Sequence, residues 1–303
     1  MATLSLKGIF PPLPTSFDRD ENLVADRIRF NIEKLSAYNL AGFLILGSNG
    51  EQVMLSTTER IEAVAAAREA LPEGRLLLAG TGCPSTRETI SLTRAVAGEG
   101  AHAVLVINPS YYRGNMNHDE LVRHYHDVAD ASPVPVLVYN MPANTGIDMT
   151  ARMIIAMAEH PNIIGLKESG GNVAKMGEIL GNVRPGFQVL AGGAGFLLPA
   201  LSVGAAGGIL AAANIAPGHC LDIFNAFAAG DIARARELQQ RIIPLNAAVT
   251  ARWGAPALKA AMDELGLYGG HVRRPLLPLD DKTTKELLDL MRSDGLDLYR
   301  QIK

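Results

Sequence analysis

The segment "IIGLKES", residues 163–169, places a lysine inside an apolar run. Lysine is rarely buried, because taking its charge out of water without a partner costs several kcal/mol. A free lysine has a pKa of about 10.4, so only about one amine in 2,500 is neutral at pH 7. Burial lowers that pKa, and the neutral amine can form a Schiff base. Lys167 is therefore a candidate nucleophile, although its stem could instead carry the charge past the strand end to a carboxylate.

Two hydroxyl groups end other apolar runs and could assist such an amine. Tyr139 ends "PVLVYN", and Ser48 follows the run in "GFLILGSNGE". A phenol and a hydroxyl can relay protons during imine formation. The segment "GSNGE" also offers backbone amides that suit a carboxylate. On these residues alone, a tyrosine that merely satisfies its hydroxyl and an ordinary glycine-rich turn are the favoured interpretations.

Eight apolar runs alternate with helical patterns along the chain. The runs lack polar alternation, as expected for parallel strands that are covered on both faces. Helices are expected between them, with starts at Ser56 or Thr57, at Ser85 or Thr86, and at Asn117. The eight runs are "KGIFPPLPTSF", "GFLILG", "RLLLAGTG", "AVLVINPS", "PVLVYNMP", "IIGLKES", "FQVLAGG" and "AGGILAAAN".

This alternation predicts an α/β fold, a (β/α)8 TIM barrel over residues 1–230, in preference to a doubly wound open sheet. Helical patterns within residues 231–303 predict additional C-terminal helices, an extension packed on the barrel. The active sites of such barrels lie at the C-terminal ends of the strands. On its strand Lys167 shares a face with Gly165 and Ser169, and that face is expected to look into the barrel.

Composition argues against several other functions. The chain has 303 residues, a net charge of −3 and scattered basic residues, so no nucleic-acid partner is expected. No apolar run reaches the length of about 18 residues that spans a bilayer, so no membrane partner is expected. Cys83 and Cys220 lack metal-site spacing, and we expect a cytoplasmic protein with no metal and no cofactor. His124 and His126 stand two apart in a helical pattern, which predicts a solvated surface.

Five ordered motifs resemble those of the dihydrodipicolinate synthase / N-acetylneuraminate lyase family over nearly the whole chain: "GSNGE", "PSYYRG", "YNMPANTG", "GLKES" and "AGGAGFLLPAL". The resemblance implies a (β/α)8 class I aldolase that acts without metal on pyruvate or a related 2-oxo acid. By position, it implies Lys167 as the imine lysine, Tyr139 as the proton-relay tyrosine and Ser48 as a further hydroxyl in that relay.

The same resemblance implies the remaining site residues and an assembly. Tyr111 matches a tyrosine that family members commonly lend to the site of a neighbouring subunit, so a homotetramer, a dimer of dimers, is expected. Pyruvate is the expected small-molecule partner. The expected substrate-binding residues are Asn49, Gly50, Asn144, Ser169 and Gly193.

One departure from the family pattern concerns the substrate. Dihydrodipicolinate synthases usually carry an arginine in "YNxPxRTG" that binds the carboxylate of aspartate semialdehyde, whereas Asn144 stands here. Loss of a bidentate partner should weaken that substrate. With "LNAAVT" and "YGG", the motifs instead resemble those of 4-hydroxy-2-oxoglutarate aldolases, which release pyruvate and glyoxylate.

Several alternatives stay open at this point. Within the family they are dihydrodipicolinate synthase activity and the cleavage or dehydration of 2-keto-3-deoxy sugar acids. A further alternative is that the protein is not an enzyme and that the barrel binds a 2-oxo acid without converting it. Lys167 and Tyr139 favour an enzyme, because binding alone needs neither.

Overall fold

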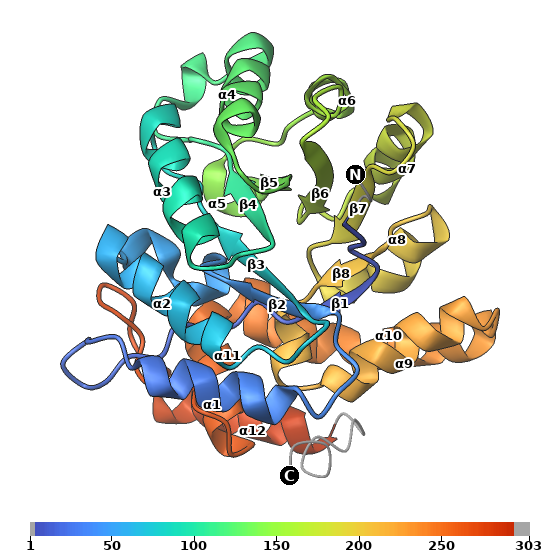
Figure 1. Ribbon diagram of the computed structural model, residues 1–303. Helices are drawn as coiled ribbons and strands as arrows, with labels where there is room; N and C mark the ends of the chain where they lie inside the picture. Colours follow the sequence, from blue (N-terminus) through green and yellow to red (C-terminus); the bar gives the residue numbers. More distant parts are fainter. Residues whose placement is uncertain (1–3, 294–303) are drawn as a thin grey trace.

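The computed structural model describes residues 4–293, in which eight parallel strands are surrounded by helices (Figure 1). The strands are β1 (Gly8–Phe10), β2 (Gly42–Ile45), β3 (Leu76–Gly80), β4 (Ala103–Ile107), β5 (Val136–Asn140), β6 (Ile163–Glu168), β7 (Gln188–Ala191) and β8 (Gly207–Ile209). Each strand from β2 to β8 pairs with the next, and β8 pairs with β1. The ring closes where Leu44 N donates to Pro11 O at 3.0 Å and Leu13 N donates to Leu44 O at 2.9 Å. The predicted (β/α)8 barrel is confirmed.

Three helices, α2, α3 and α4, begin where the sequence predicts. Ser56 accepts a hydrogen bond from Glu59 N while the Glu59 carboxylate accepts from Ser56 N, a capping box at the start of α2. Ser85 caps α3 in the same position, and Asn117 precedes α4 without a side-chain cap. The helices are α1 (Ala25–Leu35), α2 (Thr57–Glu69), α3 (Thr86–Gly98), α4 (His118–Ala131), α5 (Pro142–Thr145), α6 (Ala151–Met157), α7 (Val173–Asn182), α8 (Leu197–Ser202), α9 (Pro217–Ala228), α10 (Ile232–Ala247), α11 (Gly254–Glu264) and α12 (Asp281–Ser293).

Side chains alternate between two apolar layers along the strands, as the two-residue period of a strand requires. The outer layer, between strands and helices, includes Phe43, Leu77, Val104, Val138 and Leu166. The inner layer fills the barrel and includes Phe10, Leu44, Leu78, Leu105, Leu137, Tyr139 and Leu190. Tyr139 therefore points into the barrel.

The helices after residue 230 pack on the barrel, with α10 beside α9 (Figure 1). Buried Gln239 of α10 accepts from Leu198 N and donates to Ala194 O, both at 2.8 Å. Between residues 4 and 293, no helix is long and apolar enough to cross a membrane. Within that range, no group of three or more His, Cys, Asp or Glu side chains is placed to hold a metal ion.

The expectation of a solvated surface is wrong for His124. It is 5% exposed, because it follows buried Leu121 by three residues and so shares the face of α4 that packs against α3. Its Nδ1 lies 2.9 Å from Thr86 Oγ1. Burial lowers the pKa of His124 to about 4. His126 is only partly buried.

Candidate functional site

Tyr139 and Lys167 face each other at the C-terminal ends of two neighbouring strands. The β5–β6 register pairs these residues, and Lys167 Nζ lies 4.2 Å from the centre of the Tyr139 ring. Lys167 is 3% exposed and Tyr139 is 4% exposed. Because Tyr139 belongs to the inner layer, its contact with the amine places Lys167 Nζ inside the barrel.

Ser48 extends this pair into a row of three polar groups. Ser48 Oγ lies 3.1 Å from the hydroxyl oxygen of Tyr139, and either group could be the donor. Ser48 opens the 3₁₀ turn η1 (Ser48–Gly50), which also contains partly buried Asn49 and buried Gly50. Thr15 Oγ1 donates to Gly50 O at 2.5 Å and holds this turn against the end of β1. The two hydroxyl groups are thus close enough to exchange a proton, and the amine lies over the ring of the same tyrosine.

Two other buried lysines provide a comparison with Lys167. Lys175 lies 3.0 Å from the buried carboxylate of Glu168, and Lys259 lies 2.5 Å from that of Glu51. No carboxylate of the described chain lies within ion-pair distance of Lys167. Its amine is therefore not held in a salt bridge. The structure excludes the alternative in which the Lys167 side chain extends past the strand end to a carboxylate.

A cavity of about 370 Å³ adjoins Ser48, and two other predicted residues, Tyr111 and Asn144, also line it. None of its lining residues is a lysine or an arginine. A small hollow shares part of the lining and reaches Tyr139. The cavity is lined by Ser48, Gln52, Val53, Gly82, Cys83, Pro84, Ile107, Asn108, Pro109, Ser110, Tyr111, Asn144 and Thr145.

Large apolar side chains are exposed in the lining of this cavity, at Val53 and Tyr111, and beside it, at Tyr112. Tyr111 is 85% exposed, Tyr112 is 71% exposed and Val53 is 76% exposed. The two tyrosine rings meet edge to face with centroids 5.1 Å apart. Such exposed apolar groups in one place are typical of an interaction surface.

The predicted residues Ser169 and Gly193 lie on the β6–β7 side and do not line the cavity. Gly192 N donates to Glu168 O at 2.7 Å, so the two strand ends stay together. A Cβ on Gly192 would overlap Ser169 Oγ, which explains the glycine at that position. Ser169 Oγ is buried and has no hydrogen-bond partner among residues 4–293, so it can accept or donate to a bound molecule.

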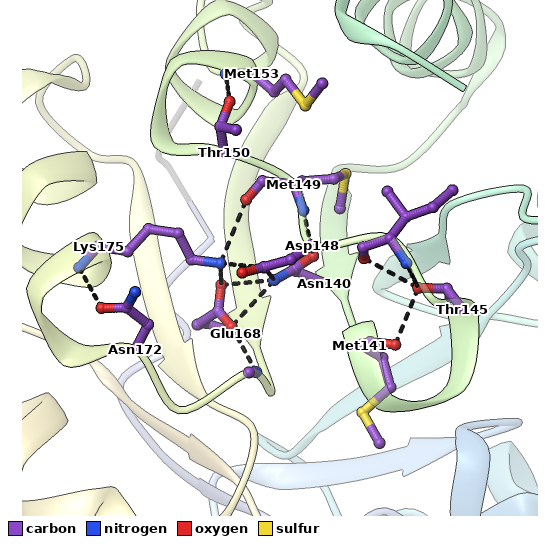
Figure 2. A network of polar contacts seen from close by, with 12 residues as sticks. Asn140, Met141, Thr145, Asp148, Met149, Thr150, Met153, Glu168, Asn172 and Lys175 are labelled. Atoms are coloured by element: carbon purple, nitrogen blue, oxygen red, sulfur yellow. Dashed lines mark hydrogen bonds and ion pairs between the residues drawn. The ribbon is translucent and has the colours of Figure 1, made fainter. Parts of the chain in front are cut away.

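A polar network fixes the neighbours of Tyr139 and Lys167 (Figure 2). Asn140 Nδ2 donates to Glu168 Oε2 at 3.0 Å and to Asp148 Oδ1 at 2.7 Å. Lys175 Nζ lies 2.5 Å from Asp148 Oδ1 and 3.0 Å from Glu168 Oε2. Gly170 N donates to Glu168 Oε1 at 2.6 Å. Every partner of the fully buried Glu168 carboxylate is a donor, as a buried anion requires.

The network has two consequences for the site. Asn140 and Glu168 are opposite each other in the register, one residue beyond Tyr139 and Lys167, so their bond fixes that pair of strands. Burial acts to raise the pKa of Asp148, but hydrogen bonds from Lys175 and Asn140 lower it overall. Sequence reasoning missed Lys175 and Asp148. The available signal was Glu168 itself, a carboxylate in an apolar run that needs a cation.

Comparisons with known proteins place this geometry in context. The model of the dihydrodipicolinate synthetase family matches residues 5–293. A 4-hydroxy-tetrahydrodipicolinate synthase of Methanoculleus marisnigri is 35% identical over 95% of this chain and 99% of its own. A probable mitochondrial 4-hydroxy-2-oxoglutarate aldolase of Emericella nidulans is also 35% identical, over 98% of this chain and 97% of its own. Two relatives that are named for different reactions are thus equally similar in sequence to this chain.

Solved structures agree with the fold. A dihydrodipicolinate synthase from Bacillus anthracis superposes with a TM-score of 0.92 at 26% identity, covering 96% of this chain and 99% of the other. YagE from E. coli K12, a prophage protein in complex with pyruvate, gives 0.90 at 31% identity, with coverage of 96% and 99%. The match extends over almost the whole barrel and its C-terminal helices.

Proposed function

The chain belongs to the dihydrodipicolinate synthetase family, and we propose that it is a lyase that binds pyruvate-derived 2-oxo acids as a Schiff base on Lys167. The observation that carries this proposal is the contrast among buried lysines. Lys175 and Lys259 each have a carboxylate partner, whereas the amine of Lys167 lies against the ring of Tyr139. An amine held in this way is suited to attack a carbonyl carbon.

The proposed chemistry assigns a role to each group in the row. The Lys167 amine adds to the C2 ketone, and Tyr139, with Ser48 behind it, carries protons to the oxygen that leaves as water. In 4-hydroxy-2-oxoglutarate, loss of the C4 hydroxyl proton then breaks the C3–C4 bond, and the electron pair moves into the iminium. Glyoxylate leaves, and the enamine is protonated at C3. Water finally hydrolyses the imine, which releases pyruvate and regenerates the amine.

Backbone and hydroxyl groups would hold the carboxylate next to the ketone. At the turn Ser48–Gly50 these are the N–H groups of Ser48 and Asn49 and the side-chain amide of Asn49, because Gly50 N already donates to Gly47 O at 3.0 Å. Ser169 Oγ has no partner in the described protein and lies beside Gly192, which precedes Gly193. These groups can bind a carboxylate on a 2-oxo acid without any cationic residue.

Asn144 favours 4-hydroxy-2-oxoglutarate over aspartate semialdehyde as the substrate. It lines the cavity at the position where the family's synthases usually carry an arginine, and no lysine or arginine lines this cavity. Arg113 lies nearby, against Gly146, but does not line the cavity. A second candidate function, 4-hydroxy-tetrahydrodipicolinate synthesis, is supported by the Methanoculleus marisnigri relative.

Two assays separate these candidates. Pyruvate release from 4-hydroxy-2-oxoglutarate is followed alongside condensation of pyruvate with aspartate semialdehyde, under the same conditions. We expect a higher kcat/KM for pyruvate release. A clearly higher kcat/KM for condensation would overturn the aldolase assignment and support the synthase.

We also propose that the chain works as a homotetramer in which Tyr111 reaches a neighbouring subunit. The exposed rings of Tyr111 and Tyr112 and the exposed Val53 support an interface at the cavity mouth. Mass measured by light scattering is expected to correspond to four chains. A monomer with full activity would contradict a shared site.

A further inference from the structure

An ion pair joins the turn that carries Ser48 to helix α11, far along the chain. Lys259 Nζ lies 2.5 Å from Glu51 Oε1, and both side chains are 2% exposed. The other carboxylate oxygen, Glu51 Oε2, accepts from Arg273 N at 2.8 Å. Lys259 also donates to His271 O at 2.5 Å. Residues of the C-terminal region therefore hold both oxygens of Glu51.

Stability alone is a weak reason for this buried pair. Burial lowers the pKa of Lys259, while the charge of Glu51 acts to raise it. Desolvation largely offsets the attraction in pairs of this kind, and apolar residues of similar volume often replace them without loss. Such a pair can, however, hold its two side chains in one fixed geometry. We therefore ask what the fixed position of Glu51 does.

Glu51 ends the turn in a conformation that needs support. Its φ is 52° and its ψ is 30°, in the left-handed region that non-glycine residues seldom adopt. Glu51 N donates to Ser48 O at 3.1 Å, which closes the turn. Thr15 holds Gly50 O from the barrel side. The turn is thus anchored at two points, and the one at Glu51 depends on Lys259 and Arg273.

The conformation of this turn decides where the Ser48 hydroxyl lies. Ser48 Oγ is 3.1 Å from the Tyr139 hydroxyl, just beyond the usual range of about 2.5–3.0 Å for such a bond, so a small displacement would break it. We propose that Lys259 is a positioning residue, which through Glu51 holds Ser48 in the proton relay to Tyr139. The inference rests on the proposed function and adds the C-terminal region to the machinery of the site.

A double-mutant cycle tests this coupling. The pair is removed as Lys259→Met with Glu51→Gln, which leaves no buried charge without a partner, in wild-type and Ser48→Ala backgrounds. The rate of pyruvate-dependent borohydride trapping and the steady-state kcat and KM are measured. We expect about a ten-fold loss of the trapping rate and of kcat, with little change in KM. In the Ser48→Ala background the further loss should be less than about two-fold.

A control variant in the same region shows whether a loss of activity is specific to the Lys259–Glu51 pair. Arg252→Met breaks an exposed ion pair with Glu286 in the same region and should leave the rates unchanged. Glu51→Asp is the milder variant if the double change prevents folding, because it keeps both charges and shortens the link by one methylene, and its loss should depend on Ser48 in the same way. Unchanged rates, or equal losses with and without Ser48, would overturn the positioning role. A wild-type protein that pyruvate and borohydride do not label would instead refute the proposed function.

Discussion

Lys167 Nζ lies over the ring of Tyr139 at 4.2 Å from its centre, and the two residues are paired in the register of β5 and β6. The Tyr139 hydroxyl lies in turn 3.1 Å from Ser48 Oγ. This row crosses three strand ends that are far apart in the sequence. Closure of the barrel is what makes the row possible.

Lys175 is the buried cation that faces Glu168 at the end of β6, next to the proposed imine lysine. Lys175→Met removes the ammonium that neutralises Glu168, which is fully buried. Leaving one partner of a buried pair alone should lower the free energy of unfolding by about 3–5 kcal/mol, measured by urea denaturation. Adding Glu168→Gln should restore much of it. The exposed Lys282→Met is the matched control, and a Lys175→Met protein as stable as that control would contradict the role given to this ion pair.

The second prediction concerns the relay. Tyr139→Phe keeps the ring but loses the hydroxyl that contacts Ser48, so kcat should fall by about 100-fold with a small change in stability. Adding Ser48→Ala should cost little more, because both act in one row. Tyr38→Phe is the control, since that hydroxyl has no hydrogen-bond partner among the described residues and precedes β2, at the end of the strand opposite to Ser48. It should change stability by less than about 1 kcal/mol and spare kcat. Full activity of Tyr139→Phe would exclude the relay.

The third prediction concerns substrate choice. Asn144→Arg introduces a bidentate carboxylate partner at the cavity, so condensation with aspartate semialdehyde should rise by about ten-fold or more in kcat/KM. Asn144→Leu removes the amide without adding a guanidinium and should show no such gain. Because Asn144 is exposed, stability should change by less than about 0.5 kcal/mol in either variant. Equal condensation rates in both variants would argue against position 144 as the determinant.

The fourth prediction concerns acid stability. Burial lowers the pKa of His124 to about 4, below the ordinary histidine value of about 6.5. The unfolded chain therefore binds a proton first as the pH falls, and the stabilisation that is complete above about pH 6.5 is lost progressively down to about pH 4. The loss should approach 3 kcal/mol, to order of magnitude. Denaturation at pH 7 and pH 5 should show a smaller difference for His124→Leu than for the half-buried control His118→Leu. Equal differences would mean that His124 does not titrate in this way.

Much of the fold could be predicted because local patterns determine it. Apolar runs without polar alternation identified the strands, and Ser56 and Ser85 identified helix starts through their capping hydrogen bonds. Lys167 and Tyr139 could be proposed because polar residues at apolar strand ends meet at one mouth of a barrel. Period and position made both residues candidates, and the resemblance of the five motifs to a known family is what assigned them their roles.

Other features depend on contacts that no local pattern contains. Glu51 and Lys259 are 208 residues apart, and only the packed structure brings them together. Lys175 looks like a surface lysine on α7 until Glu168 and Asp148 are placed beside it. His124 was misjudged because a polar residue can occupy the buried face of a helix when a neighbour such as Thr86 satisfies it.

Lys167 should form an imine with pyruvate, which borohydride reduces to a stable adduct that peptide mass analysis can locate. The protein is incubated with pyruvate and borohydride, and wild type is compared with Lys167→Met, whose fold should persist because no ion pair is lost. The prediction is a pyruvate-dependent mass increase on the peptide that contains Lys167, absent from the variant. No adduct on wild type, or an adduct on Lys175 or Lys259 instead, would contradict the account.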